Sequence, residues 1–260
     1  MFIYLIFYKK TQPGEINLYY PLACRIAHGD YNFITTRGIL EVLPLGHLFR
    51  AFGEKKEILH VYMYVSGVAS MLVLLNIISL YKPLSNVFLL IFLACNVMPS
   101  WKWHGGWRIF FGNLSVYLYI THHPLLSGLS SGIGFFHSIE MGILPLLSTF
   151  NYYSVMGFVL IFFLTLYKTY LLKYINLIFT NPIFSTNETN GYITPQWKLD
   201  IHVVFRFALL FLFFPLVYSQ SYFSLWLYGV LVYLAAFRNI GGTEILHPLQ
   251  IMFALAYLKL

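Results

Sequence analysis

Long apolar runs alternate with short polar segments along the chain. A helix needs about 20 mostly apolar residues to cross a bilayer, so this alternation predicts a series of membrane helices joined by short turns. Several Tyr and Trp residues lie near the ends of the runs, where amphipathic rings favour the lipid headgroup region. The predicted segments are 58–80, 84–100, 107–125, a fourth run that ends near 150, 152–172, 201–219, 221–238 and 245–260.

The runs predict an all-α fold, a polytopic membrane helix bundle with about seven or eight membrane segments. Residues 1–57 are predicted to form an N-terminal interfacial segment, because 38–53 mixes apolar residues with Glu41, His47 and Arg50 as a helix on a membrane surface does. Residues 58–260 are predicted to form the transmembrane helical domain, with a polar loop at 180–200.

Composition supports the bilayer as the solvent of this chain. Hydrophobic residues make up 59% of it and charged residues only 10%, against roughly a quarter charged in a typical soluble domain. The net charge is +7, but Lys and Arg are spread over the segments between runs rather than gathered on one face. This distribution argues against a nucleic-acid partner and makes membrane lipid the expected one. Cys24 and Cys95 have no metal-type or redox-type spacing, so no disulfide framework is expected.

The placement of the lysines bears on orientation and on the fourth run. If Lys55 and Lys56 face the cytoplasm, the positive-inside rule holds through the third run, and the uncharged turn expected at 126–131 lies outside. If the fourth and fifth runs both span, Lys168 falls outside, which the rule disfavours. The fourth run contains several Gly and a Pro, so we predict that it is re-entrant or interfacial. The apolar start followed by basic residues is not that of a cleavable signal and fits a multi-pass protein of a bacterial inner membrane.

Two pairs of ionisable residues lie inside apolar runs, where such residues are costly and often functional. His137 and Glu140 form one pair, and Glu244 and His247 form the other. Each pair is spaced i, i+3, which places both side chains on one face of a helix. Facing Glu-x-x-His pairs supply metal ligands in helix bundles. We therefore predict these four residues as a catalytic set that also offers a speculative metal site.

Other interpretations of the two pairs stay open. One pair runs in the reverse order, both segments contain Pro, and the further carboxylates of a bridged di-metal site are missing. The His and Glu side chains would then hydrogen-bond to one another or to interfacial water. They could equally line a path for protons or substrate. The metal and any other cofactor are not identified by the sequence.

Three arginines lie at the ends of predicted segments and suggest contact with anions. They are Arg108, Arg206 and Arg238. Arginines in such places usually extend to the headgroups, and they also suit the geometry of phosphate and carboxylate groups. We predict a role in binding an anionic headgroup or substrate. The neighbouring WKWHGGW, residues 101–107, is predicted to be an aromatic belt, or else a substrate platform with His104 in reach.

The order of features from Pro21 to His123 resembles the horizontally transferred transmembrane domain family, which is related to the membrane part of vitamin K-dependent γ-carboxylase. The similar features are PLACRIAHG, with Arg25 and Gly29, the polar stretch through TTRGILEVLPL, the hairpin 58–100 and the Arg-bearing GGWRIFFGNL. The resemblance covers about two fifths of the chain and implies a helical membrane domain. The first helix expected after Arg25 is poorly formed and the soluble C-terminal region of the carboxylase has no counterpart, so the resemblance does not extend to carboxylase activity.

Three functions remain as hypotheses. The sequence favours a membrane-embedded enzyme that acts on a lipophilic substrate, because His and Glu occur together in two separated segments. A transporter or channel-like protein is the alternative suggested by a broken segment with buried ionisable groups. A non-catalytic scaffold subunit, in which polar residues only join helices, is the third.

Overall fold

The computed structural model describes residues 13–30, 39–90, 92, 106–137, 139–166, 223–236, 251, 254, 255, 257 and 258. Among these residues the regular elements are all helices, joined by short turns. The predicted all-α class is therefore confirmed for these residues. Within them, one helix, Lys56–Ser79, is long and apolar enough to cross a membrane by length and composition. Shorter apolar stretches occupy Val42–Phe52, Tyr152–Phe163 and Phe223–Val232. The number of membrane segments stays a prediction.

The N-terminal part of the described chain forms two packed helices, α2 (Pro13–Ala27) and α3 (Ile39–Phe52). Gly46 brings α3 close to α2, since a side chain in its place would meet Ile26. α3 ends at Phe52 and is followed by Gly53, whose positive φ of 88° suits a left-handed helix cap. The cap is closed by the Gly53 N–H, which donates to the Phe49 carbonyl oxygen at 2.8 Å. The helix predicted within 38–53 is thus present as α3.

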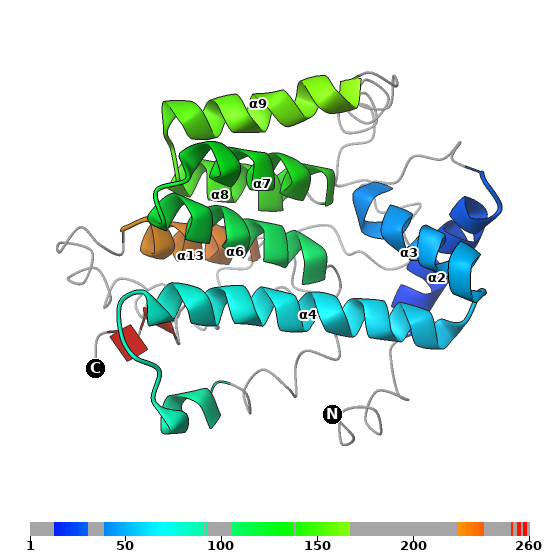
Figure 1. Ribbon diagram of the computed structural model, residues 1–260, viewed down its shortest axis with the longest axis horizontal. Helices are drawn as coiled ribbons and strands as arrows, with labels where there is room; N and C mark the ends of the chain where they lie inside the picture. Colours follow the sequence, from blue (N-terminus) through cyan, green and yellow to red (C-terminus); the bar gives the residue numbers. More distant parts are fainter. Residues whose placement is uncertain are drawn as a thin grey trace.

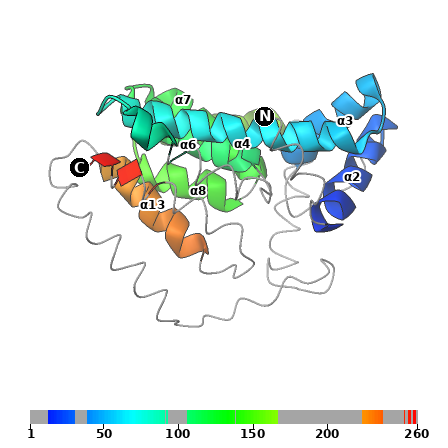
Figure 2. The ribbon, with the colours of Figure 1, turned by 90° about the horizontal axis from the view of Figure 1, so that it is seen from below.

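Four helices lie side by side in a row, and the α2–α3 pair lies at one end of this row (Figure 1). They are α4 (Lys56–Ser79), α6 (Gly106–Ile120), α7 (Pro124–His137) and α9 (Tyr152–Leu166), and each packs on the next. α8 (Ile139–Ser148) and α13 (Phe223–Ala236) lie on one side of the row, as Figure 2 shows. α4 coincides with the predicted span 58–80 to within two residues.

The structure corrects the prediction for the Gly/Ser-rich stretch. A turn was expected at 126–131, but these residues form the middle of α7, and the real turn is at His122, where φ is 64°. Tertiary packing explains the difference. Gly128 and Gly132 allow the backbone of α9 to approach α7, because a Cβ at Gly128 would meet the backbone of Ser154. The prediction of a turn was wrong because the Gly and Ser residues of this stretch serve close packing of α7 against its neighbours.

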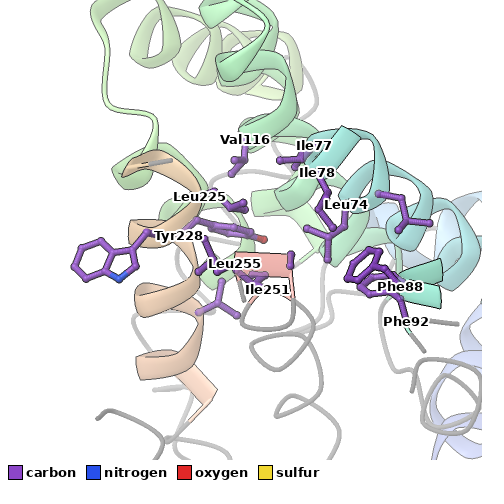
Figure 3. Packing of buried hydrophobic residues seen from close by; sticks show 14 residues of the cluster. Leu74, Ile77, Ile78, Phe88, Phe92, Val116, Leu225, Tyr228, Ile251 and Leu255 are labelled. Carbon is purple, nitrogen blue, oxygen red and sulfur yellow. The ribbon is translucent and has the colours of Figure 1, made fainter. Parts of the chain in front are cut away.

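The main apolar core joins segments that are far apart in the sequence (Figure 3). Tyr228 of α13 is fully buried between α6 and the C-terminal segment, and its hydroxyl group lies against Gly112 of α6. Near the end of α4, Phe88 stacks on Tyr257 with ring centroids 3.9 Å apart. Tyr257 also donates a hydrogen bond to the Pro83 carbonyl oxygen at 2.6 Å. The C-terminal segment is thereby attached to the chain that follows α4.

Candidate functional site

His137 is the predicted site residue that the structure buries most clearly. It is the last residue of α7 and only 3% of its surface is exposed. Its ring stacks on Phe111 of α6, with centroids 5.2 Å apart and planes inclined by 29°. Within the described part of the chain, its Nδ1 atom has no hydrogen-bond partner. A buried polar atom of this kind is costly, so the position calls for a functional explanation.

Arg108 is the second basic residue at this place. It lies in the first turn of α6, one turn before Phe111, and is 8% exposed. Residues three apart lie on one face of a helix, so Arg108 and Phe111 both face the end of α7. The Arg108 guanidinium is close enough to His137 for the two groups to interact electrostatically. The structure thus brings together two residues that the sequence placed in separate predicted sites.

Aromatic side chains border this basic site on the side of α4. Trp107 contacts Tyr62 of α4 with ring centroids 5.7 Å apart and Phe110 at 5.5 Å. Its indole Nε1–H is buried and has no hydrogen-bond partner among the described residues. α3 contacts α7, so the start of α6 and the end of α7 lie toward the N-terminal helix pair (Figure 1).

His137 and Glu140 lie in two different helices, so their i, i+3 spacing does not by itself place the two side chains on one helix face. α7 ends at His137, and Glu140 belongs to the separate helix α8. α7 and α8 pack closely against each other, because a Cβ at Gly142 would meet the backbone of Phe135. An i, i+3 spacing implies a shared face only within one continuous helix. Gly142 can pack against Phe135 because α7 and α8 are two separate helices.

The remaining predicted site residues lie outside the described residues. They are Glu244, His247, Arg206 and Arg238. Among the His, Cys, Asp and Glu residues that the structure describes, no group of three or more could hold a metal ion. The four-residue catalytic and metal set therefore stays a prediction.

A cluster of buried hydroxyl groups was not foreseen from the sequence. Ser115 of α6 hydrogen-bonds to Ser127 at 3.0 Å and to Ser131 at 2.9 Å, both on α7. Ser127 donates in turn to Thr149 at 3.4 Å, just after α8. The i, i+4 spacing of the two α7 serines within SGLSSGIG was the available signal, because it places both hydroxyls on one helix face. The cluster joins α6, α7 and the end of α8.

A second polar group, around Glu54, holds α2 against the start of α4. The Glu54 carboxylate lies 2.8 Å from Nε2 of His28, and the Glu54 carbonyl oxygen accepts a hydrogen bond from the Tyr20 hydroxyl at 2.8 Å. Burial and the nearby Glu54 raise the pKa of the Cys24 thiol to about 11. Cys24 is thus a neutral, poorly reactive thiol rather than a nucleophile.

Comparison of the chain with protein-family models, curated proteins and solved structures found no match. The resemblance to the horizontally transferred transmembrane domain family accordingly stays a prediction.

Proposed function

We propose that this chain is an integral membrane protein, and the exposure pattern of α9 is the observation that carries the proposal. Ser154, a polar residue of this helix, is buried against α7. Met156, Val159, Leu160 and Phe163 are exposed, Phe163 to 66%. In water the opposite pattern is expected, with polar residues outside and apolar ones inside. Lipid is an apolar solvent, so it accommodates this helix without cost.

α4, which is longer, shows the same pattern of buried polar and exposed apolar residues. Ser66 and Ser70 are fully buried, and Ser70 accepts hydrogen bonds from the Asn113 side chain through both its carbonyl oxygen and its hydroxyl group, at 3.2 Å each. Val61, Val65 and Leu72 are exposed, Val61 to 55%. Membrane helices associate in this way, through small residues and interhelical hydrogen bonds, while apolar side chains face the acyl chains.

The shape of α7 and α8 supports the prediction that the fourth run is re-entrant. At 1.5 Å per residue, 14 residues of α7 extend about 21 Å and 10 residues of α8 about 15 Å. Each is shorter than the roughly 30 Å hydrocarbon core of a bilayer. The hydrogen bond from Ser127 to Thr149 ties the end of α8 to the beginning of α7. The pair would therefore enter and leave on one side of the membrane.

Within this class we assign the chain as a membrane-embedded enzyme that acts on a lipophilic substrate. His137 supports the assignment, since a buried imidazole with an unpartnered Nδ1 among the described residues is available to hydrogen-bond a substrate or transfer a proton. The second candidate is a non-catalytic scaffold subunit. The hydroxyl cluster of Ser115 favours it, because such hydrogen bonds serve to join membrane helices.

The membrane proposal is tested by spin-label accessibility in liposomes. In a background with Cys24→Ser and Cys95→Ser, a label at Phe163→Cys should be accessible to oxygen and shielded from a water-soluble nickel complex. A label at Lys55→Cys, in the exposed turn before α4, is the water-accessible control. Equal access of the nickel complex to both labels, or a protein that stays monodisperse without detergent, would overturn the proposal.

The enzyme proposal is tested by comparing lipid extracts from cells that produce the wild-type protein or the His137→Gln variant at equal membrane levels. A lipid species that depends on His137 supports the enzyme. Identical extracts would argue for the scaffold, in which case loss of the protein should dissociate a membrane complex.

A further inference from the structure

We propose that tyrosines at one end of the helix row form a rim that binds the headgroup region of a phospholipid bilayer. This tyrosine rim consists of Tyr81, Tyr119, Tyr152 and Tyr153. Tyr152 is 76% exposed and Tyr153 is 54% exposed, and the other two are partly exposed. The inference deepens the proposed function and rests on it, because it assigns the depth at which the proposed membrane protein meets the headgroups.

The tyrosine rim is assembled from three helices that end or begin at one edge of the row. Tyr81 follows α4, Tyr119 lies in the last turn of α6, and Tyr152 begins α9. In Figure 1 these three helix ends lie on the same side of the molecule, away from the α2–α3 pair. Packing agrees with this placement, because Tyr81 and Ile120 of α6 pack against the same core cluster.

Each part of the tyrosine rim borders a polar turn. Lys82 follows Tyr81, the exposed His122 follows α6, and Asn151 precedes Tyr152. Tyrosine has an apolar ring and a polar hydroxyl group, so it is favoured where the hydrocarbon core of a bilayer meets the headgroups. The tyrosine rim fits this boundary, with the polar turns toward water and the apolar helix faces toward lipid.

Exposed residues along α4 mark the opposite boundary. Residues 54–57 are all charged and exposed, whereas the exposed side chains of Val61, Val65, Leu72 and Leu80 are apolar. No Asp, Glu, Lys or Arg occurs between the two sets. The 19 steps from Val61 to Leu80 extend about 28 Å at 1.5 Å per residue. Since the hydrocarbon core of a bilayer is about 30 Å thick, the charged turn and the tyrosine rim are one bilayer apart.

Polar side chains of α4 near the tyrosine rim are bonded to their own helix. The exposed Asn76 side chain donates to the Leu72 carbonyl oxygen at 2.8 Å, and the exposed Ser79 hydroxyl donates to the Asn76 carbonyl oxygen at 2.8 Å. Such bonds lower the cost of a donor that faces hydrocarbon, where no water is present. α4 is therefore compatible with lipid up to the tyrosine rim.

α9 gives a second estimate of depth. Phe163 lies 11 residues after Tyr152, which corresponds to about 16 Å along the helix. Leu72 lies eight residues before Leu80, which corresponds to about 12 Å along α4. Half of the hydrocarbon core is about 15 Å thick. Both exposed side chains, Phe163 and Leu72, are thus assigned to the middle of the bilayer.

Spin labels on α4 test the assigned depth in liposomes of phosphatidylcholine and phosphatidylglycerol. The background carries Cys24→Ser and Cys95→Ser, and the labelled variants are Val61→Cys, Leu72→Cys and Leu80→Cys. The measured quantity is the ratio of accessibility to oxygen over accessibility to a water-soluble nickel complex, which rises with depth. We expect a severalfold higher ratio at Leu72 than at Val61 and Leu80, which serve as matched controls. Equal ratios at the three positions, or a maximum at Leu80, would overturn the proposal.

Labels on α9 test the tyrosine rim itself. Tyr153→Cys should give a low ratio typical of the headgroup region, and Phe163→Cys should give the same high ratio as Leu72→Cys. Equal ratios at Tyr153 and Phe163 would contradict the assignment.

The wild-type protein provides an independent measurement if a labelled variant does not fold, as judged by elution. Phosphatidylcholine with a photoreactive group in its headgroup should modify residues 150–153, whereas the same lipid with the group at its chain end should modify Phe163. The reverse pattern would overturn the proposal.

The outcomes separate this inference from the membrane proposal. A lipid-exposed label at Phe163 combined with a depth maximum away from Leu72 would overturn the tyrosine rim and leave the membrane proposal in place. Equal access of the nickel complex to labels at Phe163 and Lys55 would overturn both.

Discussion

Cys24 shows how a single residue reports the packing around it. Burial and the nearby Glu54 carboxylate raise the pKa of the Cys24 thiol from 9.0 to about 11. We predict that in a Cys95→Ser background the folded protein reacts with iodoacetamide at pH 8 more than tenfold more slowly than an unfolded control, because only the thiolate reacts. Glu54→Gln should speed the reaction. Equal rates in folded and unfolded protein would contradict the assignment.

The same shift has a consequence for stability with a defined sign. A thiol whose folded-state pKa is raised binds its proton more tightly in the folded protein. Its contribution is complete below the unfolded pKa of about 9 and is lost as the pH rises toward about 11. Melting temperatures of the Cys95→Ser protein should therefore fall over this window by more than those of a variant that also carries Cys24→Ala.

A substitution at Gly128 tests the close contact between α7 and α9. A Cβ there would meet the backbone of Ser154, which cannot move as a flexible side chain does. Gly128→Ala should lower the free energy of unfolding by about 1–3 kcal/mol, the usual cost of overpacking. Leu126→Ala, at an exposed site of the same helix, should have a smaller effect. The melting temperatures of the two variants in detergent provide the measurement, and equal values would rule out the contact.

At the scale of the element, hydroxyl groups join α6 to α7. Ser115 bonds to both Ser127 and Ser131, and interhelical hydrogen bonds in membrane proteins contribute about 0.6 kcal/mol on average and up to about 1.7. Ser115→Ala should thus destabilise the protein by about 1–2 kcal/mol. Its effect should not add to that of Ser127→Ala in a double-mutant cycle. Ser79→Ala, which removes only a bond within α4, is the control. Strict additivity would show that the cluster is not coupled.

At the scale of the whole molecule, the re-entrant pair makes a topological prediction. His123 precedes α7 and Phe150 follows α8, and both are exposed. We expect cysteines at these two positions to react with an impermeant maleimide from one side of the membrane. A cysteine at Lys55, before α4, should react from the cytoplasmic side, opposite to both. Reaction of the His123 and Phe150 positions from opposite sides would show that the fourth run spans.

Within the described residues, several helices could be predicted from the sequence because apolar runs coincide with them. α4 and α9 begin close to the predicted positions, since their boundaries are marked by the basic turn at Lys55 and Lys56 and by the break at Asn151. The stretch 126–131 was not readable. Gly and Ser favour turns when they are alone, but they favour close helix packing when another helix is present, and the partner helix begins more than 20 residues later.

The sequence by itself determined the helical class, the apolar character and the presence of ionisable residues inside apolar runs, because these depend on composition and on patterns along one segment. Only the tertiary structure decided which of those residues meet. It ended α7 at His137 and placed Glu140 in the separate helix α8, and it placed His137 beside Arg108 of the preceding helix. Spacing along a chain determines a shared face only within one helix, whereas contact between helices depends on where each helix ends and how closely glycines allow its neighbour to approach.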